Sequence, residues 1–178
     1  QNVVKLETSK VVSVIERQLV AKLHRLIYNF DENYYLDNVQ SVDTTLGCFT
    51  EGGTAANMTA LWAARNNAFL PKEGFEGVEK EGLFRAYQAY GVERAVVLVS
   101  QRGHYSLSKA GGVLGLGNNN IVSVASDCDG TVLISDLKEK INRFSNDSSA
   151  KIIAVVGVAG TTETGHIDPL PEMAEICR

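Results

Sequence analysis

The sequence RAVVLVSQRGHYSLSKAGGVLGLG, residues 94–117, contains the clearest structural pattern in the chain. Residues 94–100 are mostly apolar, which is typical of a strand buried on both faces of a sheet. A polar turn follows, and residues 105–117 are predicted to form a helix. This order of strand, turn and helix is typical of an α/β fold with a parallel sheet.

The same alternation continues on both sides of this stretch. Further strands are predicted at 120–126 and, fully buried, at 151–160. Apolar spacing, caps and flanking turns predict helices at 9–30, 54–67, 83–91, 136–147 and 168–178. Residues 31–43 are predicted to be an irregular crossing, and residues 70–82 a charged surface excursion. We therefore expect a three-layer α/β fold with a mainly parallel sheet.

The composition is that of an ordinary globular chain. Of the 178 residues, 44% are hydrophobic and 21% are charged, and the formal net charge is -4. The sequence has no basic stripe, so nucleic acid is not expected as a partner. It has no run of about 18 apolar residues, and its first ten residues lack the apolar region of a leader peptide. We therefore expect no membrane partner and a cytoplasmic location.

The spacing of the three cysteines and three histidines is typical of neither a disulfide framework nor a structural metal site. We expect Cys48, Cys128 and Cys177 to be buried thiols, and we expect no metal. His24 has no ligand partner in reach along its predicted helix. It is therefore interpreted as a packed or half-exposed helix residue.

The turn TEGGT, residues 50–54, leads into a predicted helix. Backbone N–H groups at the start of a helix favour an anion, and glycines let a phosphate approach the backbone closely. Thr54 offers a hydroxyl donor and could also cap the helix. Gly53 and Thr54 are therefore candidates for a phosphate site, although an ordinary turn with an N-cap explains the same residues equally well.

The turn VAGTTETGHIDP, residues 158–169, follows another apolar strand and contains Thr161, Thr162 and Thr164. Ligands of parallel sheets bind beyond the carboxyl ends of the strands, so these hydroxyls could bind a polar ring substituent. Local capping is the alternative. It is favoured for Asp168, which precedes Pro169 at a predicted helix start. His166, in the same turn, is not expected to bind a ligand.

His104 lies in the turn between residues 94–100 and the helix that follows. No cysteine or acidic residue stands within two positions of it, so the spacing does not support a nucleophilic dyad, and a role as general base stays open. An imidazole also offers a flat face that can stack on an aromatic ring. Lys109 is interpreted as a solvated helix residue rather than as a reactive amine.

Three segments together resemble, in order and spacing, part of the large domain of the group II pyridoxal-phosphate-dependent amino-acid decarboxylases. They are GCFTEGGTAANMTALWAARN, VLVSQRGHYSLSKAGGVLGLG and VVGVAGTTETGHIDPLPEMAEIC. The residues of these segments, together with NVVKLETSK at 2–10, are most similar to those of aspartate 1-decarboxylases and glutamate decarboxylase-like proteins. The resemblance implies the aspartate-aminotransferase-like fold (PLP fold type I). It also implies a partial PLP-binding large domain at 46–178, preceded by an amino-terminal helix and crossing at 1–45.

The resemblance also implies roles for single residues. Gly53 and Thr54 match the turn that binds the phosphate of pyridoxal 5'-phosphate, and Thr162 matches a threonine near the phenolic oxygen of its ring. His104 matches the histidine that stacks on the ring, which makes it the candidate for both cofactor binding and catalysis. Asp168 matches an acidic position that we interpret as structural. Family members work as homodimers with the active site at the subunit interface.

Two functional residues of the family have no counterpart in these 178 residues. The aspartate that binds the ring nitrogen and the lysine that forms the Schiff base both follow the segment that residues 172–178 match. None of the nine lysines stands in the matching context. We therefore expect a piece of a longer polypeptide, inactive by itself but able to bind phosphate or free cofactor weakly.

The resemblance predicts that the parent protein decarboxylates an L-amino acid and releases CO2. Aspartate or glutamate is the favoured substrate, with an aromatic amino acid as a rival. A transaminase or desulfurase of the same fold is an alternative, although the GHYS and GTTETG spacing favours the decarboxylases. A third alternative is a non-catalytic binding module in which the glycine and threonine turns are purely structural.

Overall fold

The structure is a computed structural model that describes residue 9 and residues 11–178. It divides into two compact units, Gln1–Glu51 and Gly52–Arg178. The comparison with a leader peptide and the segment NVVKLETSK rest on residues 1–10, which, apart from Ser9, lie outside the described residues. Within the described part, no helix is both long and apolar enough to cross a membrane.

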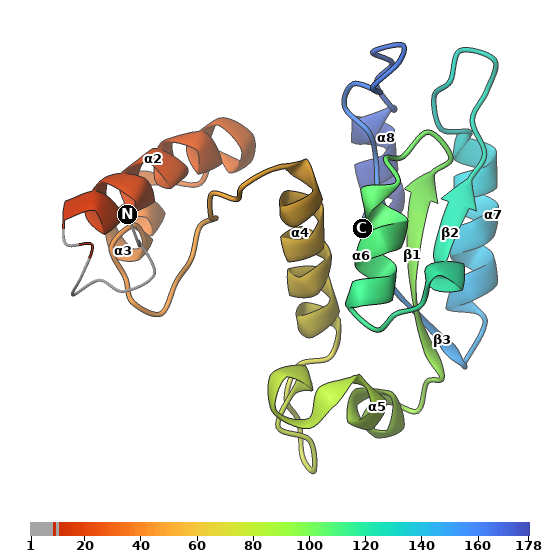
Figure 1. Cartoon of the computed structure of the whole chain (residues 1–178), viewed down its shortest axis with the longest axis horizontal. Coiled ribbons are helices and arrows are strands. Elements are labelled where there is room, and N and C mark those ends of the chain that lie inside the picture. The colour runs from red at the N-terminus through yellow and green to blue at the C-terminus, as the bar shows by residue number, and fades with distance from the viewer. Residues whose placement is uncertain (1–8, 10) are drawn as a thin grey trace. The chain divides into compact units, whose positions relative to one another are not determined.

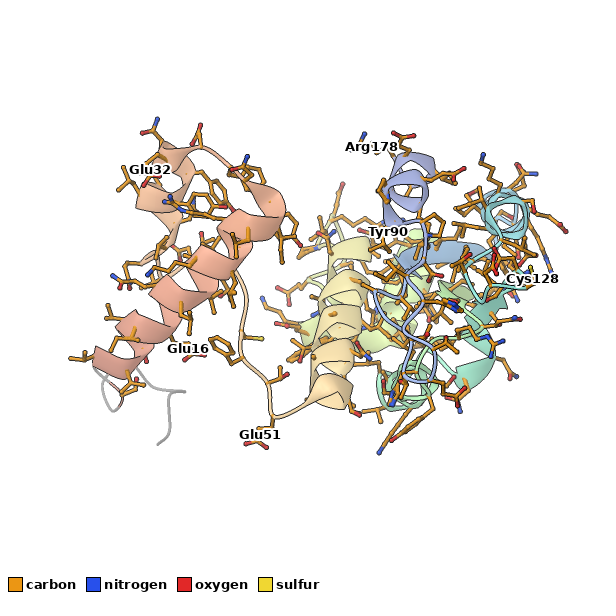
Figure 2. All side chains as sticks on the ribbon, turned by 90° about the horizontal axis from the view of Figure 1, so that it is seen from above. Glu16, Glu32, Glu51, Tyr90, Cys128 and Arg178 are labelled. Carbon is orange, nitrogen blue, oxygen red and sulfur yellow. The ribbon has the colours of Figure 1, made fainter. Side chains whose placement is uncertain are left out.

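The first unit contains two helices, α2 (Val11–Tyr28) and α3 (Glu32–Asn38) (Figure 1). The helix predicted at 9–30 is confirmed, whereas the prediction of an irregular crossing is wrong over α3. Asp31 caps α3 by accepting a hydrogen bond from the backbone N–H of Tyr34 over 2.8 Å. Glu32, which opens α3 (Figure 2), forms an ion pair with Arg25 of α2.

Aromatic packing around His24 explains why this polar segment becomes helical. Tyr35 of α3 is 1% exposed, and its hydroxyl lies 3.0 Å from Nδ1 of His24. Three further rings lie within 4.4 to 6.1 Å of the His24 ring, those of Tyr28, Phe30 and Tyr34. His24 is therefore a packed helix residue, as predicted, and contact with α2 stabilises α3.

The second unit is built on a three-stranded parallel sheet with the strand order β2, β1, β3 (Figure 1). Its strands are β1 (Arg94–Ser100), β2 (Ile121–Val124) and β3 (Ala150–Val156). The predicted parallel sheet is confirmed. β1 lies in the centre and is buried, but β3 is half-buried along its whole length rather than fully buried as predicted, because it lies at an edge of this sheet.

Helices cover both faces of this sheet. The helical elements of the unit are α4 (Gly53–Ala68), α5 (Val78–Tyr90), α6 (Ser106–Val113), the short 3-10 helix η1 (Asn118–Asn120), α7 (Ile134–Ser145) and α8 (Leu170–Ile176). Side chains of β1 alternate between the faces. One core joins β1 to α4 and α6 through Ala95, Val97, Val99, Leu61 and Leu107. The other joins β1 to α7 and α8 through Val96, Leu98, Leu137, Phe144 and Met173. The three-layer arrangement is therefore confirmed.

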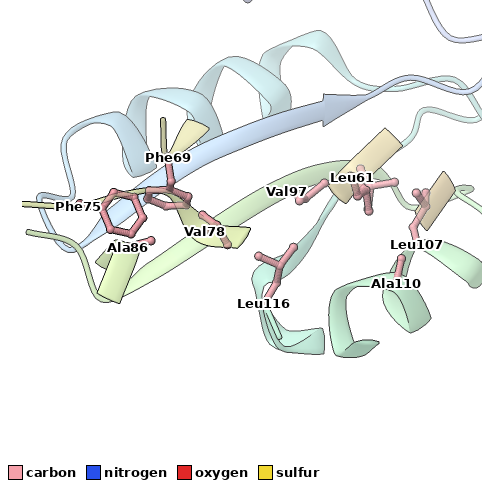
Figure 3. Close-up of a cluster of buried hydrophobic side chains, with 11 residues drawn as sticks. Leu61, Phe69, Phe75, Val78, Ala86, Val97, Leu107, Ala110 and Leu116 are labelled. Atoms are coloured by element: carbon pink, nitrogen blue, oxygen red, sulfur yellow. The ribbon is translucent and has the colours of Figure 1, made fainter. Parts of the chain in front are cut away.

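The charged excursion predicted at 70–82 is partly buried. Figure 3 shows Phe69, Phe75 and Ala86 at one end of the first core, away from Leu107. Phe75 is 2% exposed, because backbone hydrogen bonds with Lys72 close a turn that directs it inward. α5 begins inside this segment and bends at Gly82, where φ is 79°. Packing of apolar side chains thus overrides the polar composition of the segment.

All three cysteines are exposed, so the prediction of buried thiols is wrong. Cys48 and Cys128 lie in loops, and Cys177 directly follows α8. Figure 2 shows Cys128 on the outer side of its unit. A small apolar residue is buried when it lies on the inward face of a helix or strand, and none of the three cysteines lies on such a face.

Candidate functional site

Two polar turns leave the sheet at the same edge. Val99 of β1 pairs with Val156 of β3 in parallel register. The residues after these strands, 101–105 and 157–168, therefore begin side by side. In open parallel sheets this edge is where ligands bind, because loops from neighbouring strands converge there.

Gly103 makes the first of these turns tight. Its N–H donates to the carbonyl oxygen of Ser100 over 2.7 Å. A Cβ atom on Gly103 would lie 2.9 Å from that oxygen and 2.7 Å from Cγ2 of Val99. Glycine is therefore needed at this position, and the turn that it permits places His104 directly beyond the strand end.

Hydrogen bonds hold the imidazole of His104. The backbone N–H of Ser106 donates to Nδ1 over 3.2 Å, and the Ser106 hydroxyl lies 2.9 Å from the same nitrogen. Because Nδ1 accepts, these contacts assign the ring proton to Nε2. Nδ2 of Asn57 in α4 donates to the Ser106 hydroxyl over 2.8 Å, and Ser106 is fully buried.

The ring of Tyr105 lies beside the imidazole of His104. Their centroids are 4.2 Å apart and their planes are tilted by 37°. Tyr105 itself is 72% exposed. One face of the imidazole is thus in contact with a neighbour, and a planar ligand has the other face on which to stack.

The second turn uses most of its hydroxyl groups internally. The hydroxyls of Thr161 and Thr164 lie 2.8 Å apart, and the Thr161 hydroxyl accepts a hydrogen bond from the His166 N–H over 3.0 Å. Nδ1 of His166 lies 3.1 Å from the Thr164 hydroxyl. Within residue 9 and residues 11–178, the hydroxyl of Thr162 has no hydrogen-bond partner, and Thr162 is exposed. Of these threonines, Thr162 is therefore the one with a hydroxyl available to a ligand.

The two turns line one pocket of about 420 Å³, formed by residues 101–105 and 161–164. His104 and Thr162, which are far apart in the sequence, meet in this pocket. Arg102 and Glu163 also line it and were not singled out from the sequence, although they stand in the same turns. The pocket combines a flat imidazole, a free hydroxyl and a guanidinium group.

The model for the pyridoxal-dependent decarboxylase conserved domain matches residues 1–178. The chain belongs to the pyridoxal-dependent decarboxylase family. This confirms the predicted family, whose members are pyridoxal-dependent decarboxylases.

Individual relatives of this decarboxylase-family chain agree with that assignment. Aspartate 1-decarboxylase of Aliivibrio fischeri is 47% identical over 178 residues, which are 100% of this chain and 32% of that protein. L-2,4-diaminobutyrate decarboxylase of Rhizobium meliloti is 34% identical over 73% of this chain and 22% of its own length. The chain thus spans about a third or less of the length of these relatives.

Solved structures confirm the fold. The glutamate decarboxylase domain of a diaminobutyrate-pyruvate transaminase and L-2,4-diaminobutyrate decarboxylase from Vibrio parahaemolyticus superposes with a TM-score of 0.79 at 26% identity. The match covers 99% of this chain and 34% of that one. The predicted fold type I is therefore confirmed for the part of the domain that this chain contains.

Gly53 and Thr54 lie at the start of α4 and do not line the pocket of His104. α4 begins one residue earlier than predicted and its N-cap is Gly52, so the capping role considered for Thr54 is wrong. No atom lies within 4 Å of a Cβ built on Gly53. Asn57, one helical turn further along α4, connects this helix to His104 through Ser106.

The predicted role of Asp168 as a helix cap is wrong. The N-cap of α8 is Pro169, and no side chain caps it. Asp168 is 4% exposed, and its carboxylate accepts hydrogen bonds from the backbone N–H groups of Val132 over 2.9 Å and of Val158 over 2.7 Å. The carboxylate thus ties the segment just after β3 to the loop after β2.

Proposed function

We propose that the protein carrying this chain is a pyridoxal-phosphate-dependent L-amino-acid decarboxylase that releases CO2 from an acidic amino acid. Aspartate is favoured over glutamate. The observation that carries this choice is the 47% identity to an aspartate 1-decarboxylase over all 178 residues. We further propose that the protein is a homodimer, as the resemblance to the family implies, and that it is cytoplasmic.

The chemistry of the pocket fits the ring of the cofactor. His104 offers one imidazole face, and hydrogen bonds on Nδ1 already hold that ring in place. Thr162 shares the pocket and has a hydroxyl to donate to the phenolic oxygen. A flat face and a hydroxyl donor suit the aromatic ring and the phenolic oxygen of pyridoxal phosphate.

The start of α4 suits the phosphate. The first backbone N–H groups of a helix have no partner within the helix and point along its positive end. The space in front of Gly53 is open, so an anion could approach the backbone there, and the hydroxyl of Thr54 adds a donor. Gly53 and Thr54 would then bind the phosphate.

When bound, pyridoxal phosphate supplies an electron sink for the bond that breaks at the substrate. The described residues would contribute binding and orientation. His104 would orient the ring by stacking on it, and Thr162 by a hydrogen bond to its phenolic oxygen. The nine lysines of the chain include none in the family context of a Schiff-base lysine, so we propose that this segment alone binds the cofactor weakly and without turnover.

Replacing His104 tests the cofactor site. We expect His104→Ala to raise the dissociation constant for pyridoxal phosphate about tenfold, because a desolvated ring contact is worth on the order of 1 kcal/mol. Equilibrium dialysis measures it. Lys109→Ala, an exposed change on α6, is the matched control and should bind like the wild type. Equal affinity in all three proteins would instead favour the non-catalytic module.

Product analysis tests the reaction and the substrate. The protein that carries this chain is incubated with pyridoxal phosphate and, separately, with aspartate, glutamate and 2,4-diaminobutyrate. We expect CO2 release, fastest from aspartate. Keto-acid formation without CO2 would favour the transaminase, and faster release from another substrate would overturn the preference for aspartate.

A further inference from the structure

Two residues from two different helices form a hydrogen-bonded series that ends at His104, in the turn after β1. Asn57 belongs to α4 and Ser106 opens α6. The series runs from Nδ2 of Asn57 to the Ser106 hydroxyl over 2.8 Å, and from that hydroxyl to Nδ1 of His104 over 2.9 Å. It connects the helix whose start is the proposed phosphate site with the imidazole of the ring pocket.

The series has a direction. The amide nitrogen of Asn57 can only donate, so the hydroxyl oxygen of Ser106 accepts that bond. The hydroxyl proton of Ser106 is then available for Nδ1 of His104, which is unprotonated because the Ser106 N–H also donates to it. Both bonds therefore support the imidazole tautomer that carries its proton on Nε2.

Burial makes this arrangement hard to replace with water. Ser106 is 0% exposed, and Asn57 is half-buried. His104, by contrast, is exposed at the pocket. A hydrogen bond to the second nitrogen of a functional histidine fixes both its tautomer and the orientation of its ring.

We propose that Asn57 and Ser106 are positioning residues that hold His104 in the Nε2–H tautomer and set the angle of its stacking face. This inference rests on the proposed function, because the proposed function supplies the pyridoxal ring on which the imidazole of His104 stacks. Neither residue touches the pocket, because both act through His104. Asn57 has no route to His104 except through Ser106 among the contacts of the described residues.

The first experiment needs no cofactor. In 15N-labelled protein freed of pyridoxal phosphate, at about pH 8 where imidazoles are neutral, proton–nitrogen correlation spectra report the tautomer of each histidine. His104→Ala identifies the His104 signals by their loss. We expect the Nε2–H tautomer in the wild type and a mixture in Ser106→Ala. In Asn57→Asp, the introduced carboxylate would capture the Ser106 hydroxyl proton and so produce a similar mixture.

The second experiment measures cofactor affinity by equilibrium dialysis. Loss of one neutral hydrogen bond to the imidazole should raise the dissociation constant for pyridoxal phosphate about 3- to 10-fold in Ser106→Ala and in Asn57→Asp. Because Asn57 acts through Ser106, the double variant should be no weaker than Ser106→Ala alone. Ser108→Ala, an exposed change on the same helix, is the matched control and should equal the wild type in both experiments.

The outcomes separate the two proposals. An unchanged His104 tautomer in both variants, or additive losses of affinity in the double variant, would overturn the positioning role. A wild type that binds no pyridoxal phosphate would overturn the proposed function, while the spectra still decide whether Asn57 and Ser106 hold the imidazole. Circular dichroism on every variant ensures that only folded proteins are compared.

Discussion

Val99 of β1 and Val156 of β3 are paired in parallel register at the carboxyl edge of the sheet. Through this pairing, the turns after the two strands start at the same level, and His104 and Thr162 come to line one pocket. Local turn geometry then directs the side chains. Changes in these turns should therefore separate effects on stability from effects on cofactor binding.

Gly103→Ala should destabilise the fold. The added methyl group would lie 2.9 Å from the carbonyl oxygen of Ser100. Because Ser100 belongs to the central strand, its backbone cannot move without disturbing the sheet. We expect a loss of about 1–3 kcal/mol in the free energy of unfolding, measured by urea denaturation. Gly53→Ala is the matched control for stability. A Gly103→Ala chain as stable as the wild type would contradict the tight turn.

Gly53→Ala should show the opposite behaviour. No atom lies within 4 Å of a Cβ at this position, and alanine is a good helix former, so stability should be unchanged or slightly higher. The methyl group would occupy the space proposed for the phosphate. We expect the dissociation constant for pyridoxal phosphate to rise about tenfold, as judged by equilibrium dialysis. Unchanged affinity would place the phosphate elsewhere.

Asp168→Ala should cost about 2–4 kcal/mol of folding free energy. It would leave the N–H groups of Val132 and Val158 without the carboxylate that they bind in a buried environment. Asp168→Asn keeps one acceptor and should lose less. Urea denaturation measures both, with the exposed Asp129→Ala as control. Equal free energies of unfolding for Asp168→Ala and Asp129→Ala would show that the hydrogen bonds of Asp168 do not stabilise the fold.

Asp147 should make stability depend on pH in the acid range. Hydrogen bonds from the Ser149 hydroxyl and from Arg94 lower its pKa from 3.8 to about 2. The ionised form is thus favoured by folding, so its contribution is complete above about pH 4 and is lost as the pH falls through 2.

The variant Asp147→Asn checks this contribution. The free energy of unfolding from urea denaturation should fall less between pH 4 and pH 2 in the variant than in the wild type. The comparison requires that the slope of the unfolding free energy against urea concentration, the m-value, is the same in the two proteins. Parallel pH profiles would show that the Arg94 and Ser149 contacts do not stabilise the folded chain.

Local patterns were sufficient for most regular elements of the second unit, although α5 begins within the excursion predicted at 70–82. β1 at 94–100 and its parallel neighbours follow from apolar runs, α4 follows from good helix formers after a Gly-Gly turn, and α7 follows from the alternation of strands and helices. The pattern failed for α3, because its helical state depends on Tyr35 packing against the His24 ring of α2. It failed for the cysteines because burial depends on the face that a residue occupies, which composition does not contain.

The sequence by itself determined the α/β class, the family, and the candidates His104, Thr162, Gly53 and Thr54. Only the tertiary structure decided how they are arranged. Parallel strand pairing brings His104 and Thr162 into one pocket, whereas Gly53 and Thr54 stay outside its lining. The structure also revealed Asn57 and Ser106 behind the histidine and gave Asp168 its place between two loops. Hydrogen bonds between residues distant in sequence require a folded backbone to align donor and acceptor, and no local pattern encodes that alignment.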